Sequence, residues 1–248
     1  MSNWKSAYVN ELVLMMYRKK VVIIAVFSAI LPVLAALLMR SLQPLLGLFA
    51  VSSSFPVEML GLFTSVWLPL VMLTLTADLF PQEVSGRTLK LILIRPVTRL
   101  QVFLGKVAAL ATVIGALLVI SGLVSYLCMA AAGTSAGFSE VLLTAKAYLA
   151  GYGAMLAILT LFVFVAQFFK SVSGYILVMI SLYAAIKLAP FLNSSIAAFS
   201  PASYTGWHLL WLSPYVSGSR LLTGALFLTA SCVLFLSLGY YKFDRKDL

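Results

Sequence analysis

Long, uninterrupted runs of apolar residues alternate with short polar intervals along the whole chain. A hydrocarbon core about 30 Å thick requires about 20 apolar residues from each helix that crosses it. Six runs meet this requirement, and they cover residues 21–39, 60–79, 107–131, 147–169, 174–192 and 221–241. Strands of a membrane β-barrel would alternate with a period of two, whereas these runs are continuously apolar. The pattern therefore predicts an all-α membrane protein with six transmembrane helices.

The composition agrees with this class. Hydrophobic residues make up 62% of the chain and charged residues 10%, whereas soluble domains are about 45–50% apolar. We therefore expect residues 1–248 to form a single transmembrane domain. Pro32 and Pro69 lie near the middle of the first two spans, where each removes a backbone hydrogen bond and can kink its helix.

The net charge of +10 raises the question of a nucleic-acid partner, which the distribution of the charges disfavours. An even number of spans places both termini on one side of the membrane, together with two connecting segments. Thirteen of the 17 basic residues fall on that side: Lys5, Arg18, Lys19, Lys20, Arg87, Lys90, Arg95, Arg99, Lys106, Lys170, Lys242, Arg245 and Lys246. This asymmetry follows the positive-inside rule and predicts a cell-membrane protein with both termini in the cytoplasm.

Residues 1–20 form a mixed polar and apolar segment before the first span. Large apolar side chains recur there at helical spacing, while charged residues such as Lys5 and Glu11 lie elsewhere on the helical wheel. The apolar set is Trp4, Tyr8, Leu12, Met15 and Met16. This pattern predicts an amphipathic helix in the membrane interface; an ordinary basic flank is the alternative. Asp78, at the end of the second span, is expected to be a solvated helix end.

Residues 80–106 form the longest polar interval between two long apolar runs. Gly86 can adopt a positive φ, and Pro96 disfavours helix before it and suits the first position of a new helix. A short helix, a break and a second helix leading into the third span are therefore predicted. Leu89, Ile92 and Leu93 share one face of the short helix, so it is suited to a membrane surface or a partner protein.

The order of residues in this interval resembles the cytoplasmic loop of ABC-2 type permeases, the membrane subunits of a class of ATP-driven exporters. The matching positions are Glu83, Gly86, Thr88, Leu89, Pro96, Val97, Thr98, Arg99, Gly105 and Lys106. The six spans, the amphipathic start and the position of the loop are also similar to that family. The chain differs from the commonest family form at Arg87 and at Lys90, where an acidic residue is frequent.

The resemblance implies that the loop docks on a separate P-loop ATPase subunit and couples its closure to the membrane helices. The coupling residues would be Glu83, Gly86, Arg87, Thr88, Leu89, Lys90, Pro96 and Arg99. ATP and Mg²⁺ would bind the partner, and a second permease subunit, the same or related, would complete the pore within the membrane lipid. A basic loop held only by anionic head groups is the alternative.

Residues 193–219 are too apolar for a solvated loop and too interrupted by proline to span the membrane. They predict a pair of external re-entrant or interfacial half-helices, which the resembling family also carries before its last span. Tyr204, Trp207, His208 and Trp211 are the candidate residues, and the last three fit one face of a short helix. His208 is expected to be an interfacial neighbour of these rings, since no second histidine completes a metal site.

Catalytic motifs are missing from the sequence. No Gly-x-x-x-x-Gly-Lys-Ser/Thr run occurs, so we expect no ATPase activity from this chain, and neither Cys128 nor Cys232 predicts a metal site. An ion-gradient-driven transporter would show ionisable residues deep in its spans. That class and a non-transporting scaffold or immunity factor remain the alternatives to an exporter subunit.

Overall fold

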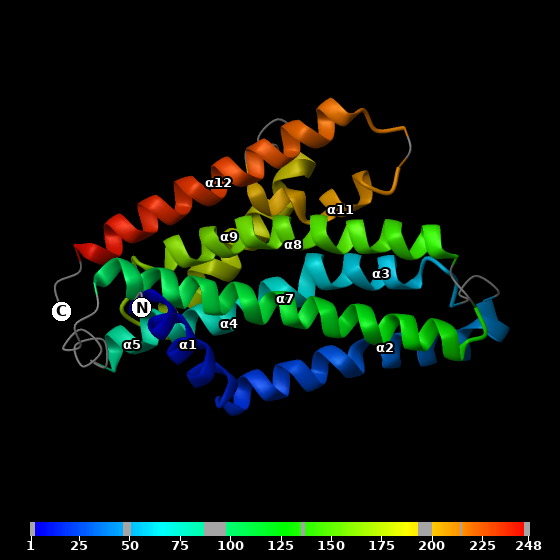
Figure 1. Cartoon of the computed structure of the whole chain (residues 1–248), viewed down its shortest axis with the longest axis horizontal. Coiled ribbons are helices and arrows are strands. Elements are labelled where there is room, and N and C mark those ends of the chain that lie inside the picture. Colours follow the sequence, from blue (N-terminus) through cyan, green and yellow to red (C-terminus); the bar gives the residue numbers. More distant parts are fainter. Residues whose placement is uncertain are drawn as a thin grey trace.

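The computed structural model describes residues 3–46, 51–86, 98–134, 137–192, 200–213 and 215–245, and in these ranges the chain is helical, without strands. Figure 1 shows the helices as an elongated bundle. They are α1 (Asn3–Met16), α2 (Lys19–Leu46), α3 (Phe55–Leu62), the π-helix η1 (Phe63–Trp67), α4 (Leu68–Leu79), α5 (Pro81–Ser85), α7 (Arg99–Ala131), α8 (Phe138–Ala166), α9 (Val172–Leu192), the 3₁₀-helix η2 (Pro201–Gly206), α11 (Trp207–Leu210) and α12 (Gly218–Asp244).

Six of the described segments are long and apolar enough to cross a membrane, as predicted. They are Lys19–Ser41, Phe55–Ser85, Arg99–Ala131, Phe138–Ala166, Val172–Ala189 and Gly218–Asp244. The second span begins at Phe55 rather than at residue 60, and the fourth at Phe138 rather than at residue 147. The helices are longer than their apolar runs because backbone hydrogen bonding continues past the first polar side chains, such as Glu58 and Lys146.

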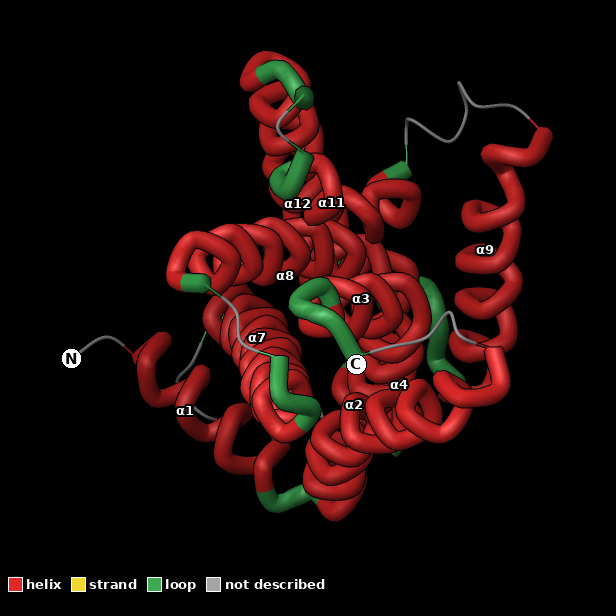
Figure 2. The backbone as a smooth tube through the Cα atoms, turned by 90° about the vertical axis from the view of Figure 1, so that its right-hand side faces the viewer, coloured by secondary structure: helices red, strands yellow, loops and turns green. Residues whose placement is uncertain are grey.

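The spans divide into a packed centre and a periphery. In the most apolar 18-residue stretch of each span, 61%, 50% and 67% of the residues are buried in the second, third and fourth spans. The corresponding shares are 17%, 11% and 11% in the first, fifth and sixth spans. Figure 2 shows α3, α4, α7 and α8 gathered together, with α9 and α12 to the outside. The outer faces of α2, α9 and α12 are apolar, so they are suited to lipid or to another subunit.

Pro69 leaves one backbone carbonyl in the second span without its usual helical donor, the N–H four residues later. That carbonyl belongs to Ser65, inside η1, and it accepts a hydrogen bond from the Tyr183 hydroxyl of α9 at 2.9 Å. Freed carbonyls in membrane helices are satisfied by neighbouring helices in this way. The proline therefore fixes where α9 meets the second span.

Glycines make room for aromatic rings between the helices. A Cβ at Gly122 of α7 would lie 3.0 Å from the ring of Tyr148 in α8, and one at Gly224 of α12 would lie 2.5 Å from Nε1 of the buried Trp207. The Tyr148 hydroxyl continues past Gly122 and donates to the Pro56 carbonyl of α3 at 3.0 Å. The Tyr148 ring thus joins α8 to α7 and α3, and the Trp207 ring joins α11 to α12.

The substitution Gly224→Ala is expected to lower the free energy of unfolding by about 1–3 kcal/mol, because its methyl group overlaps the Trp207 indole. Gly153→Ala is the matched control, since nothing lies within 4 Å of a Cβ there and alanine is favoured over glycine inside a helix by about 1 kcal/mol. Denaturant titration of both variants in detergent micelles, followed by tryptophan fluorescence, measures the difference. Equal stability of the two would contradict this packing.

Candidate functional site

The described parts of the segments predicted to share one side of the membrane lie at one end of the bundle, which we call the basic end. It holds α1, α5, the first turns of α7 and the last turns of α12 (Figure 1). Arg99, at the start of α7, donates a hydrogen bond to the Asp244 carbonyl at the end of α12. Lys242 of α12 lies 5.3 Å from the ring of Phe168, next to the turn before α9.

The predicted coupling residues fall partly within the described structure. Arg87, Thr88, Leu89, Lys90 and Pro96 lie outside the described residues. Glu83 is in α5, Gly86 caps the C-terminus of that helix, and Arg99 is the first residue of α7.

Two local features of this segment differ from the sequence analysis: the positive φ that Gly86 allows is not used, and the second helix starts later than Pro96 suggested. Gly86 has a φ of −80° rather than a positive φ, because its N–H closes a helical turn on the Gln82 carbonyl at 2.9 Å. The second helix begins at Arg99 rather than at Pro96. Its start is set by Thr98, whose hydroxyl accepts from the Gln101 N–H while the Gln101 side chain accepts from the Thr98 N–H, a capping box.

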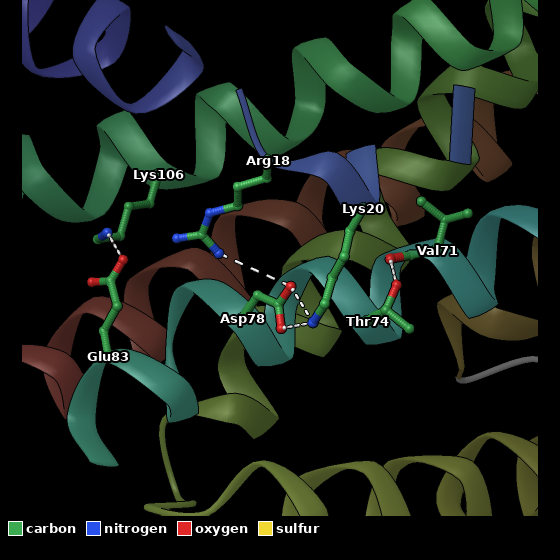
Figure 3. Close-up of polar contacts among 7 residues, drawn as sticks. All are labelled: Arg18, Lys20, Val71, Thr74, Asp78, Glu83 and Lys106. Atoms are coloured by element: carbon green, nitrogen blue, oxygen red, sulfur yellow. Dashed lines mark hydrogen bonds and ion pairs between the residues drawn. The ribbon is translucent and has the colours of Figure 1, made fainter. Parts of the chain in front are cut away.

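Lys106 of α7 is fully buried and joins three helices. Its Nζ donates to Glu83 Oε1 of α5 at 2.7 Å and to Glu11 Oε1 of α1 at 3.1 Å, and Figure 3 shows the contact with Glu83. The preceding residue, Gly105, allows α1 to come close, since a Cβ there would lie 3.4 Å from the Ala7 backbone. The Gly-Lys pair of the sequence is therefore the place where α1 packs on α7.

A second ion pair lies beside the first. Asp78, at the end of α4, accepts from Lys20 Nζ at 3.0 Å through both carboxylate oxygens, and Arg18 Nη1 is 4.0 Å from it (Figure 3). Together with Lys106, Glu11 and Glu83 these residues form what we call the charge cluster. It balances three carboxylates with three cations and connects α4 and α5 to α1, α2 and α7.

Two sequence-based expectations about the cluster are corrected by this geometry. Asp78 is only 5% exposed rather than a solvated helix end, because cations at the start of α2 cover it. Glu11 was placed on the polar face of α1, yet it is buried, while Met16 of the predicted apolar stripe is exposed. Met15 of the stripe is buried and lies one turn from Glu11 on the same face of α1, so the apolar side chain and the carboxylate face the bundle together, where Glu11 pairs with Lys106.

Two short helices, η2 and α11, lie before the last span, in the interval where half-helices were predicted. Their external position stays a prediction. Tyr204 stacks on Phe227 of α12 with ring centroids 5.0 Å apart, and Trp207 packs edge-on against Trp211 at 5.5 Å. His208 is turned toward α3 instead, with Nε2 3.9 Å from the position of a Gly61 Cβ. Trp207, His208 and Trp211 therefore do not share one face as predicted, because Trp207 packs on Gly224 of α12 while His208 points to Gly61 of α3.

His208 is buried in the fold rather than at an interface. Its Nδ1 lies 3.1 Å from the Thr205 carbonyl. Burial lowers the pKa of His208 below its usual value, although the Thr205 carbonyl opposes that shift, so the imidazole is neutral at pH 7. Among the residues that the structure describes, no three histidine, cysteine or acidic side chains gather as metal ligands.

Sequence reasoning missed a groove between the second span and α9, which we call the α4–α9 groove. Its volume is about 420 Å³, and Pro69, Tyr183 and Lys187 are among its lining residues. Lys187 Nζ donates to Thr205 Oγ1 of η2 at 2.5 Å and lies 5.6 Å from the centre of the Tyr183 ring. The four-residue spacing of Tyr183 and Lys187 was the only signal in the sequence, and it became informative once α9 was placed beside Pro69.

Replacing Lys106 by methionine is expected to lower the free energy of unfolding by about 3–5 kcal/mol, because two buried carboxylates lose their cation. Lys5→Met, on the exposed face of α1, is the matched control and should change stability little. Adding Glu11→Gln and Glu83→Gln to Lys106→Met should recover part of the loss. Denaturant unfolding in micelles tests this, and a Lys106→Met variant as stable as Lys5→Met would rule out the pairing.

Comparison with known proteins places the chain in a family. A search of curated protein sequences finds no match. A family model described as ABC-2 family transporter protein matches residues 16–187, which include all of the charge cluster except Glu11 and extend to Lys187. The match covers well over half of the chain, and the six apolar helices agree with it. The chain therefore belongs to the ABC-2 family of transporters, as one of its multi-pass membrane permeases.

Proposed function

We propose that this permease forms half of the translocation pathway of an ATP-driven exporter in the cell membrane. A separate ATPase subunit docks on residues 80–106 in the cytoplasm and drives the helices through them. ABC-2 permeases in general act with an ATP-binding subunit. The basic residues gathered at one end of the bundle support a cytoplasmic location for that end, by the positive-inside rule.

The observation that carries this proposal is the burial of Lys106 between two carboxylates. Residues 87–97 are bounded by α5 on one side and by the capped start of α7 on the other. The Lys106–Glu83 contact at 2.7 Å ties these two boundaries together. A force applied by a docked partner to the segment between them is therefore passed to both helices at once.

The same cluster extends the connection into the membrane. Asp78 joins the end of α4 to Lys20 at the start of α2, and Glu11 joins α1 to α7. Coupling between distant sites is carried by such contiguous networks when they link elements with two arrangements. The peripheral spans α2, α9 and α12 are the elements we propose to move, because little of their surface is packed within one copy of the chain.

Two further parts of the proposal concern partners. ATP and Mg²⁺ bind the ATPase subunit, since this sequence has no P-loop run. A second permease, identical or related, packs against the apolar outer faces of α2 and α12 and completes the pathway. The three carboxylates of the charge cluster lie paired at the basic end rather than at mid-membrane, so the cluster lends no support to transport driven by an ion gradient.

Charge reversal at the docking segment tests the proposal. The double variant Arg87→Glu with Arg99→Glu, in the complex with its ATPase subunit, should reduce transport-coupled ATP hydrolysis about 5- to 150-fold, the range of typical coupling energies. Repulsion of the carboxylates that the arginines face on the partner is the physical cause. Hydrolysis by the reconstituted complex, with and without cargo, is the measurement.

The matched control is Arg40→Glu with Arg220→Glu, which reverses two exposed arginines at the opposite end of the bundle and should leave coupling intact. Because Arg99 also contacts the end of α12, the single variant Arg87→Glu separates docking from folding. Unchanged coupling in the Arg87 and Arg99 double variant would refute the docking assignment.

A further inference from the structure

The α4–α9 groove is a pocket of the size that binds small molecules. Its volume of about 420 Å³ lies within the range of about 300–1,000 Å³ that is usual for such sites. Figure 2 shows α9 standing beside α4 at the outside of the bundle. Pro69 and Leu73 line it from α4, and Met179, Tyr183 and Lys187 from α9. Because both helices are membrane spans, a molecule dissolved in the bilayer reaches it directly.

The neutral polar groups that line the groove are hydrogen-bonded within the fold. The Ser65 hydroxyl donates to the Gly61 carbonyl at 2.7 Å, and the Tyr183 hydroxyl donates to the Ser65 carbonyl at 2.9 Å. The π-helix and Pro69 create this arrangement, and π-turns occur frequently at functional sites. The remaining walls are aliphatic or aromatic, so they favour a hydrocarbon body.

Lys187 is the charged residue of the groove lining. It is half-buried, and among the described residues no carboxylate lies within the 4.0 Å that defines the ion pairs of Lys20 and Lys106. Two contacts hold its ammonium toward the bundle, the hydroxyl of the buried Thr205 at 2.5 Å and the face of the Tyr183 ring at 5.6 Å. The chain thus positions a cation at one end of an apolar groove without supplying its anion.

We propose that the α4–α9 groove binds an amphiphile with one acidic head group and a hydrocarbon tail, the acid pairing with Lys187 and the tail lying along Pro69, Leu73 and Met179. The binding site itself does not depend on the proposed function. The claim that such an amphiphile is the cargo of the exporter rests on the proposed function. A cationic amphiphile is rejected by like charge, and a neutral one leaves the lysine unpaired.

Photolabelling of the purified chain in neutral detergent micelles tests the site. The probes are a fatty acid with a diazirine in its tail and the alcohol and trimethylammonium compounds with the same tail. The acid is expected to label α4 and α9 peptides, with unlabelled fatty acid competing, and to bind about tenfold more tightly than the other two.

Variants identify the head-group contact. Lys187→Met should weaken binding of the acid probe about tenfold and leave the alcohol unchanged, whereas Lys187→Arg should retain the preference for the acid. Lys146→Met, which removes an exposed lysine of α8, is the matched control and should bind as the unmodified chain does. Equal binding of acid and alcohol, or a Lys187→Met variant that binds the acid normally, would overturn the proposal. Labelling of helices other than α4 and α9 would also overturn the proposal. So would disulfide formation between two copies of an Ile180→Cys variant, because Ile180 lines the groove and such a bond would place a second copy over it.

Transport is tested separately with the reconstituted complex. The fatty acid should stimulate ATP hydrolysis by the unmodified complex and fail to stimulate the Lys187→Met complex. If the acid binds at Lys187 but does not stimulate ATP hydrolysis, the cargo inference fails and the binding site stands. If the complex shows no ATP hydrolysis coupled to any cargo, the exporter assignment fails. If another cargo stimulates ATP hydrolysis, and the acid binds the unmodified and Lys187→Met proteins equally well, the cargo inference fails and the exporter assignment stands.

Discussion

The buried ammonium of Lys106 constrains the basic end of the bundle more than any other group described there. Removing a charge from water costs several kcal/mol even after relaxation of the protein, so α7 requires carboxylates at that position. One comes from α1 and the other from α5, and Gly105 allows α1 to approach closely enough to supply its own. The close approach of α1 to α7 and the position of α5 both meet this requirement.

The sequence predicted those properties that depend on position along the chain alone. The six spans, the all-α class and the short helices before the last span are all present, because hydropathy and helix signals are local. The rotation of each helix was not predictable in this way. Lys106 is recognisable in the sequence as a basic residue and as part of the Gly-Lys pair that resembles the family, but neither property shows that it is buried between carboxylates. Glu11 and Asp78 look solvated in the sequence, because nothing local shows that they meet cations from other helices.

The same limit explains the candidate sites. Trp207 and His208 were placed on one face of a short helix, but they point to α12 and to α3, since each fills a space left by a glycine on a different neighbour. The α4–α9 groove depends on Pro69, on the Ser65 carbonyl that it frees and on Tyr183, which is far away in the sequence. Each residue was visible in the sequence, whereas their meeting required the packing of the spans.

The unequal packing of the spans has a consequence for biogenesis. The first span is the most apolar of the six and among the least buried by the others, so it can enter the bilayer without help. The second span carries Asp78 near the end of α4, and this carboxylate is costly in lipid until Lys20 of the first span is beside it. Insertion therefore has an inherent order: the helix synthesised earlier carries the counter-ion that stabilises the one synthesised later.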